Sequence, residues 1–473
     1  MRSHFWFGLI LCLASWLPSA AQARQTWTQV LMVEGQKNYV MAMDAMDASN
    51  AFLVAAVDNG GNTEMQGYRT SNGTSFQRLY LPAASGQMSM IMFTSAAMLD
   101  SSVIFLGGME IAFPTTKNTL WRSTNGGASW EVVTATLPEM PEKLVVLSDG
   151  TVLGTSAGAI FRVTGTTVTS ASLPSLGDRS IAAITMLDDL VGYAGGGSGP
   201  TDDSPNTPYG DGFVLKTIDG GLTWFSVSEN IPMKVQTISF LNEERGWIGG
   251  SGPTAGALYR TEDDGASWDP LTLPPHPAFD YEFEMPFKIT QHVDETAATS
   301  VVGVKFFDCT RGIASGVACI GGCDSEDPSF VSLVWTTSDA GNTWEFDADF
   351  ETVMTGGQLM PEAKKLSSMI HLQFPGINQG FLAGQHAMVL RYDALSPEAE
   401  PGPAPDTCEG GNNNNNNNTN NGTGDPDGSD SGCGCSAGAR TSSSPALLFL
   451  FVLVLGLALG RKRKQRVSPG SRP

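Results

Sequence analysis

The chain has 473 residues, and its 48 Asp and Glu outnumber its 27 Lys and Arg, which gives a formal net charge of −21. So acidic a surface argues against binding to nucleic acid or to anionic lipid, because both need clustered Lys and Arg. Glycine is abundant, with 54 residues, and long helical patterns are scarce, which favours an all-β fold.

The first residues have the features of a secretory signal peptide. Arg2 gives a positive start, residues 5–17 are apolar, and Ala21-Gln22-Ala23 is a small-residue cleavage site. The apolar run is too short to span a bilayer. We therefore predict that residues 1–23 are removed and that the exported chain begins at Arg24.

A short motif recurs along residues 24–396, the predicted folded domain. Its pattern is Ser/Thr-x-Asp/Asn-x-Gly-x-Ser/Thr-Trp in four copies, and a fifth copy is one residue shorter and ends in Phe. We call these five copies the box turns. Their defining residues are Asn72 and Phe76; Asn125, Gly127 and Trp130; Asp219, Gly221 and Trp224; Asp263, Gly265 and Trp268; and Asp339, Gly341 and Trp344.

The pattern resembles the Asp-box, also called the BNR repeat, and five copies make the resemblance specific. The Asp or Asn side chain can bind backbone N–H groups of a tight turn, and glycine can adopt a backbone conformation closed to other residues. The Trp can bury its ring between neighbouring sheets. The resemblance implies a hairpin corner between the third and fourth strands of a propeller blade. We interpret these residues as structural rather than as catalysts or metal ligands.

Two further elements repeat before the box turns. One is a strand of small residues, at 192–196, 246–250, 312–316 and 380–384, which would allow close packing near a propeller axis. The other is an apolar strand that ends in a cation, at Arg69, Arg122, Lys216, Arg260 and Arg391. Together with the box turns, these elements resemble the propellers of the photosystem II stability/assembly factor family, most closely at residues 238–268. The resemblance covers about residues 26–395 and implies a fold, not a role in photosynthesis.

The spacing of the repeats predicts a seven-bladed β-propeller, although six or eight blades stay open. Residues 144–163 form a degenerate blade that lacks a box turn, and the last repeat, 369–392, has only three strands. Residues 26–30 resemble the strand that follows a box turn. We expect them to complete the last blade and close the ring without an open edge.

Two insertions, at residues 198–211 and 270–299, interrupt the repeats, and the second carries the acidic and aromatic run 280–284. Loops on a rigid scaffold are where binding usually takes place. The alternative, that both insertions are surface loops without a binding function, is equally open.

Asp-boxes also occur in sialidases, whose chemistry needs three Arg to hold a carboxylate, a Tyr–Glu pair and an Asp acid. Most arginines here fall in repeated positions, which leaves only Arg24, Arg78 and Arg179, and no Arg-Ile-Pro motif follows the N-terminal strand. The histidines form no metal-binding spacing. We therefore predict no catalytic residue, no metal site and no cofactor.

Cysteines offer one or two disulfide bonds in an oxidising compartment. The candidates are Cys309, Cys319, Cys323 and Cys408. A zinc site is the alternative, but the spacing is wrong and no nearby histidine completes it.

The C-terminal part is a linker followed by an anchor. Residues 397–432 are rich in Asn, Gly and Pro, and we expect disorder there. Residues 433–466 combine Gly and Cys, a short transmembrane segment at 445–460 and a basic end that keeps the preceding chain outside. This order resembles the MYXO-CTERM sorting signal, in which Cys433 or Cys435 would be the point of processing and surface attachment. A plain anchor helix is the alternative.

The sequence thus predicts an exported propeller, anchored at the cell surface, that binds an unknown protein or glycan of the envelope without catalysis. C-terminal sorting machinery would be a second partner, and the C-terminal helix would contact the membrane. An extracellular sialidase-like glycoside hydrolase is the first alternative. A calcium-dependent adhesin, suggested by the acidity, is another.

Overall fold

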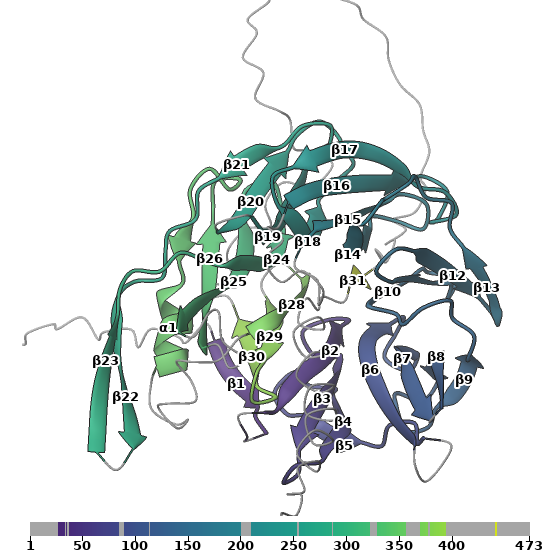
Figure 1. Ribbon diagram of the computed structural model, residues 1–473, viewed down its shortest axis with the longest axis horizontal. Coiled ribbons are helices and arrows are strands. Elements are labelled where there is room, and N and C mark those ends of the chain that lie inside the picture. The colour runs from purple at the N-terminus through teal and green to yellow at the C-terminus, as the bar shows by residue number, and fades with distance from the viewer. Residues whose placement is uncertain are drawn as a thin grey trace, which may run out of the picture.

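The computed structural model describes residues 27–33, 35, 37–84, 89–112, 114–199, 210–252, 255–285, 287–321, 329–355, 369–376, 379–393 and 440–441. Seven antiparallel sheets, each with four strands of one blade, stand around a common axis (Figure 1). The prediction of a seven-bladed propeller is confirmed. The degenerate repeat at residues 144–163 belongs to a complete four-stranded blade, the third, although it has no box turn.

Each blade runs from an inner to an outer strand in chain order, except that the last blade takes its outer strand from the N-terminus. The strands are, in blade 1, β2 (Tyr39–Ala45), β3 (Ala51–Asp58), β4 (Thr63–Thr70) and β5 (Gln77–Leu79); in blade 2, β6 (Ser89–Met98), β7 (Ile104–Ala112), β8 (Thr115–Ser123) and β9 (Glu131–Thr134); in blade 3, β10 (Lys143–Val146), β11 (Val152–Thr155), β12 (Ile160–Thr164) and β13 (Thr167–Ser170); in blade 4, β14 (Ser180–Met186), β15 (Gly192–Ser198), β16 (Gly210–Thr217) and β17 (Phe225–Ile231); in blade 5, β18 (Lys234–Phe240), β19 (Gly246–Ser251), β20 (Gly256–Thr261) and β21 (Asp269–Leu271); in blade 6, β24 (Ser300–Phe306), β25 (Gly312–Gly321), β26 (Ser329–Thr337) and β27 (Glu345–Phe346); and in blade 7, β28 (Met369–Gly376), β29 (Gln379–Gly384), β30 (Val389–Asp393) and β1 (Trp27–Leu31).

The N-terminal strand closes the ring, as expected. β1 pairs antiparallel with β30, with Trp27 opposite Tyr392. The Trp27 indole is fully buried, packs edge-on against Phe350, and donates a hydrogen bond of 3.0 Å to Asp347 Oδ2. Each inner strand contacts the next, and β28 contacts β2, so the circle is complete. The first and last strands of the ring are therefore held in one sheet. The bond from Trp27 to Asp347, 320 residues away, ties the same strand to the end of blade 6.

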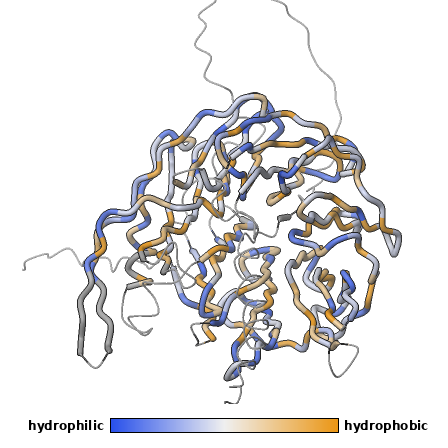
Figure 2. Tube along the Cα trace, in the orientation of Figure 1, coloured by the Kyte–Doolittle hydropathy of each residue, from blue (hydrophilic) through white to orange (hydrophobic). Residues whose placement is uncertain are grey.

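The core consists of the interfaces between blades. Figure 2 shows hydrophobic residues recurring along the strands all round the ring. At two interfaces an aromatic pair stacks, Tyr193 on Phe240 with ring centroids 3.5 Å apart and Trp247 on Phe306 at 3.4 Å. The aromatic residue of every box turn joins the core shared with the preceding blade. Trp224 and Trp344 are buried there, and the other three are half-buried.

The small residues of these strands are needed for a different reason from the close packing near the axis that the sequence suggested. They are the second strands of the blades, one step away from the axis, and six of the seven inner strands carry a register shift, the exception being β10. The residue opposite the start of the first shift in each of these strands is small: Ala55, Gly108, Gly196, Gly250, Gly316 and Gly384. A Cβ atom on Gly196 or Gly250 would lie 1.9 Å from a carbonyl oxygen of the inner strand. The requirement is thus for space beside a bulged inner strand.

Three elements lie outside the repeats. The hairpin of β22 (Phe279–Met285) and β23 (Phe287–Val293) occupies the second predicted insertion and projects from the ring (Figure 1). The helix α1 (Ala348–Thr355) follows β27, and Asp347 Oδ1 accepts the Phe350 amide at its start. The strand β31 (Arg440–Thr441) pairs with the inner edge of β10. None of these three was expected from the sequence as a regular element.

Substitution of Gly250 tests the bulge requirement. In the variant Gly250→Ala, the new methyl group would collide with the Lys234 carbonyl, and overpacking of this kind costs about 1–3 kcal/mol. Chemical denaturation should show this loss in the free energy of unfolding. The control Gly158→Ala places a methyl group where nothing lies within 4 Å and should leave stability near the wild-type value. Equal stability of the two variants would contradict the explanation.

Candidate functional site

The polar side chains that define the box turns are engaged in hydrogen bonds within those turns. In blade 5, the Thr261 hydroxyl donates to Asp263 Oδ1 at 2.8 Å and accepts the Gly265 amide at 3.0 Å. Asp263 Oδ1 accepts the Ser267 amide at 2.8 Å, and its Oδ2 accepts the Ser267 hydroxyl at 2.6 Å. The hydroxyl-to-glycine bond recurs in all five turns at 2.8–3.0 Å. Gly265 has a φ of 81°, the left-handed conformation that the turn requires.

The three box-turn aspartates are stabilised in their ionised form. Burial raises the pKa of Asp219 and Asp263, but bonds from the hydroxyl and amide of Thr223 or Ser267 outweigh it, and both values fall below the ordinary one. The Thr343 hydroxyl is the main cause that lowers the pKa of Asp339. A carboxylate held this way is a poor proton donor, since its acid form would lose these bonds.

Arginines of three third strands fasten their blades to the box turn of the next blade. Arg69 Nη1 of blade 1 donates to the Gly126 carbonyl of blade 2 at 3.0 Å, and its Nη2 donates to the Ser101 carbonyl at 2.6 Å. Arg260 of blade 5 reaches the Ala340 carbonyl of blade 6 at 3.1 Å. Arg391 of blade 7 approaches the Asn72 carbonyl of blade 1 at 3.4 Å. We call these contacts the clasps.

Two arginines of the same register bond within their own blades. Arg122 forms a 2.5 Å ion pair with Glu131, and the next blade, blade 3, has no box turn to clasp. Arg162 of blade 3 donates to Thr164 at 3.1 Å, although blade 4 does have a box turn. Blade 4 is therefore the one blade whose box turn receives no hydrogen bond from the cation of this register in the described part of the chain.

The arginines outside this register are also paired locally. Arg78 binds Glu64 at 2.5 Å, Arg179 binds Glu229, Arg245 approaches Glu262 at 3.3 Å, and Arg311 binds Asp308 at 2.7 Å. These arginines thus each have a partner in a turn, a hydroxyl or a carboxylate of their own or the next blade. Arg24 lies outside the described residues.

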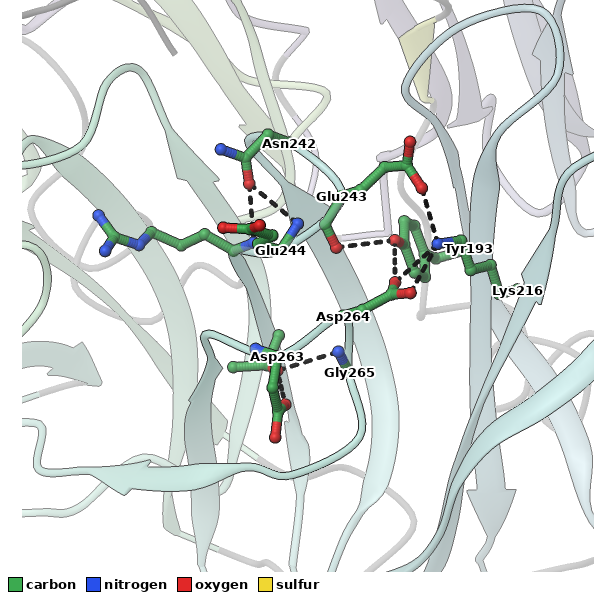
Figure 3. A network of polar contacts seen from close by, with 10 residues as sticks. Tyr193, Lys216, Asn242, Glu243, Glu244, Asp263, Asp264 and Gly265 are labelled. Carbon is green, nitrogen blue, oxygen red and sulfur yellow. Dashed lines mark hydrogen bonds and ion pairs between the residues drawn. The ribbon is translucent and has the colours of Figure 1, made fainter. Parts of the chain in front are cut away.

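A lysine replaces the arginine clasp between blades 4 and 5 (Figure 3). Lys216 Nζ donates to Asp264 Oδ2 at 2.7 Å and to Glu243 Oε2 at 2.9 Å, and it lies 5.5 Å from the centre of the Tyr193 ring. The Tyr193 hydroxyl donates to Asp264 Oδ1 at 2.5 Å. Asp264 has a φ of 63° at the turn position where blades 2 and 4 have glycine, so its strained backbone presents a carboxylate to the lysine.

This network does not prepare a reactive group. Burial alone would lower the pKa of Lys216, but hydrogen bonds to Asp264 and Glu243 outweigh it and raise the value. Burial, followed by the bond to Asp264, raises the pKa of Tyr193. The amine therefore stays charged and the phenol stays protonated, which suits an electrostatic clasp and not a nucleophile or base.

A second polar group lies where β10 and β18 begin. Burial lowers the pKa of Lys143 to about 7 against the opposing charge of Glu142, and the Lys143 ammonium nitrogen has no hydrogen-bond partner in the described structure. Burial also lowers the pKa of Lys234 and raises that of Glu142. A buried amine with a lowered pKa beside a carboxyl group with a raised pKa is a combination often found in acid–base chemistry. Sequence reasoning missed this group, because no motif marks these residues.

A further repeated turn was also missed. An Asp or Asn accepts backbone amides two and three residues ahead, as Asp308 does from Thr310 at 2.8 Å and Arg311 at 2.7 Å. The signal was present, since each such residue stands four positions before its second strand. The members are Asp47, Asp100, Asp188, Asn242 and Asp308.

Several predicted residues have no described position. Cys309 and Cys319 are disulfide-bonded, while Cys323, Cys408, Cys433 and Cys435 lie outside the described residues, as does the predicted segment 445–460. Among the residues that are described, no helix is long and apolar enough to cross a membrane. Nor do three or more His, Cys, Asp or Glu side chains gather there as a metal ion would need.

Comparison with known proteins gives similarity in structure only. No protein-family model and no curated protein matches the chain. A solved structure described as YCF48 bound to D1 peptide is similar at 16% identity and a TM-score of 0.49, covering 78% of this chain and 98% of that one. YCF48 from Cyanidioschyzon merolae gives 16% and 0.47 with the same coverage. A GH74 enzyme of Niastella koreensis gives 14% and 0.37, covering 72% of this chain and 62% of that one.

Removal of one box-turn hydroxyl tests the turn. In Thr261→Val, the Gly265 amide loses its acceptor inside a buried turn, which costs about 1–3 kcal/mol. Denaturation should report that loss. The control Thr299→Val removes the hydroxyl that accepts the Cys319 amide at an exposed site and should cost less. An unchanged free energy of unfolding for Thr261→Val would refute the role of the hydroxyl.

The ionised aspartates predict an acid-sensitive contribution to stability. Because their folded pKa values lie below the ordinary value of 3.8, their contribution is complete above that pH and is lost as the pH falls through the folded values. The variant Asp219→Asn/Asp263→Asn/Asp339→Asn, which copies Asn72 and Asn125 of blades 1 and 2, should lose less stability on acidification below pH 3.8 than the wild type. Parallel curves of unfolding free energy against pH would disprove this.

Proposed function

We propose that the chain is a cell-surface β-propeller that binds a protein or glycan of the envelope and serves as a scaffold. The observation that carries the proposal is that the repeated acidic and basic side chains already form hydrogen bonds within the ring. The aspartates of the box turns bind amides and hydroxyls of their own turns, and three of the repeated arginines clasp neighbouring blades. Groups saturated in this way hold a rigid ring, which is what a binding scaffold needs.

The location is part of the proposal. The signal peptide predicted at residues 1–23 and the sorting signal predicted at residues 433–466 support export and surface attachment. The predicted linker of residues 397–432 would hold the propeller away from the membrane. The acidic charge of −21 suits an exported protein that must stay soluble.

Capture from an envelope extract tests binding. The purified full-length chain, carrying an affinity tag, should retain a defined partner from untreated extract. Digesting the extract with protease, or oxidising its glycans with periodate, should abolish retention in one arm and identify the class of partner. Failure to retain anything in any arm would contradict the proposal.

Assays of hydrolysis test the enzymatic alternative on the same protein. Fluorogenic sialosides and β-glucosides should be hydrolysed no faster than in buffer. The variants Glu142→Gln and Lys143→Met alter the buried group at the start of β10 whose pKa values are shifted by burial. Turnover by the wild type that either variant abolishes would replace the scaffold function with a hydrolase.

A further inference from the structure

The blades provide an internal reference for function, because positions that serve the fold should look alike in all box turns. At three exposed positions blade 4 departs from the others. Ile218 corresponds to Ser71, Thr124, Glu262 and Ser338; Leu222 to Thr74, Ala128, Ala266 and Asn342; and Phe225 to Gln77, Glu131, Asp269 and Glu345. Blade 4 alone has a large apolar residue at each position.

These side chains are exposed to solvent. Ile218 is 58% exposed, Leu222 48% and Phe225 43%. A fourth residue, Leu190, is 59% exposed, and its carbonyl accepts the Gly220 amide at 2.9 Å, which places it against the same turn. Its counterparts Ser49, Ser102, Glu244 and Thr310 are polar. We call these four residues the blade-4 patch. The other four box turns adopt the same fold with polar or small residues at these positions, so the turn itself does not require large apolar ones.

Three carboxylates adjoin residues of this patch in the chain. Asp188 and Asp189 precede Leu190, and Asp219 lies between Ile218 and Leu222. Hydrogen bonds from Ser148 lower the pKa of Asp189, and the box turn lowers that of Asp219, so both are ionised at neutral pH. The one nearby cation of the clasp register, Arg162, donates to Thr164 of its own strand. The two turns that carry the patch are therefore acidic, and we call Asp188, Asp189 and Asp219 the carboxylate rim.

The ring itself indicates what binds such a turn. In three other blades the carbonyl at or beside the glycine accepts an arginine from the preceding blade, at Gly126, Ala340 and Asn72. The equivalent Gly220 carbonyl accepts no hydrogen bond among the described residues, although the turn has the same hydroxyl and aspartate bonds. A guanidinium from another molecule could make the bond that the chain omits.

We propose that the blade-4 patch is the docking surface for a cationic protein segment that presents Arg next to apolar side chains. The inference rests on the proposed binding function and specifies its site and the chemistry of its partner. The apolar side chains of the segment cover Ile218, Leu222 and Leu190, and its Arg reaches the Gly220 carbonyl and the carboxylate rim. A second copy of this chain is disfavoured, because both surfaces would be acidic.

Replacement with the residues of blade 6 gives a test that preserves the fold. The variant Ile218→Ser/Leu222→Asn/Phe225→Glu copies Ser338, Asn342 and Glu345, which occupy the same turn in blade 6. The matched control Thr124→Ser/Ala128→Asn makes the corresponding changes in blade 2, where Glu131 already stands. Thermal unfolding verifies that both variants are folded.

The probe is a displayed library of random 12-residue peptides, selected on the immobilised full-length chain. Enriched peptides should combine Arg or Lys with Leu, Phe or Trp, and their affinity, measured by fluorescence anisotropy, should fall with added salt. Binding should be at least tenfold weaker for the blade-4 variant and unchanged for the blade-2 control.

Three results would overturn the inference. Equal binding to wild type and blade-4 variant would refute the site, while a partner captured from envelope extract would still uphold the binding function. Selection of acidic peptides, or of none, would refute the chemistry of the partner. A wild-type dimer that the blade-4 variant converts to a monomer, seen by sedimentation, would assign the patch to a second copy.

Discussion

A hydroxyl group held between a carboxylate or amide oxygen and a glycine amide is the interaction on which this ring depends. The hydroxyl fixes the left-handed glycine, and the glycine turns the chain so that the following aromatic residue enters the interface with the preceding blade. The turn also exposes the carbonyl that a clasp arginine can reach. One local bond thus determines a turn, a core contact and a connection between blades.

Because these side chains are already hydrogen-bonded within the fold, the repeats have little chemistry left to perform. An aspartate that accepts an amide and a hydroxyl is held in its ionised form by its own turn, and an arginine that spans two blades is already bound. Neither group is suited to act as a general acid or as a substrate clamp. Differences between blades therefore carry more functional information than the repeats themselves. The absent clasp and the exposed apolar residues of blade 4 are such differences, as are Lys143 and Glu142 at the start of blade 3.

Much of the fold could be predicted because its signals are local and repeated. The box turns lie within eight residues each, and the resemblance of Trp27 to the aromatic residue after a turn was enough to place the N-terminal strand. Contacts between distant residues could not be predicted. The bond from Tyr193 to Asp264 spans 71 residues, and only the geometry of the ring brings them together. The glycines of the second strands were recognised, but their cause, a bulged neighbour, appears only in the register of the strands.

Hydrogen–deuterium exchange at the box-turn glycines tests the central claim most directly. If the hydroxyl bond holds the turns as described, the amides of Gly73, Gly127, Gly221, Gly265 and Gly341 should exchange as slowly as strand amides of their own blades, because only opening of the blade exposes them. Exchange at the rate of an unstructured peptide would show that the turns are open in solution, and the structural assignment of their aspartates would fail.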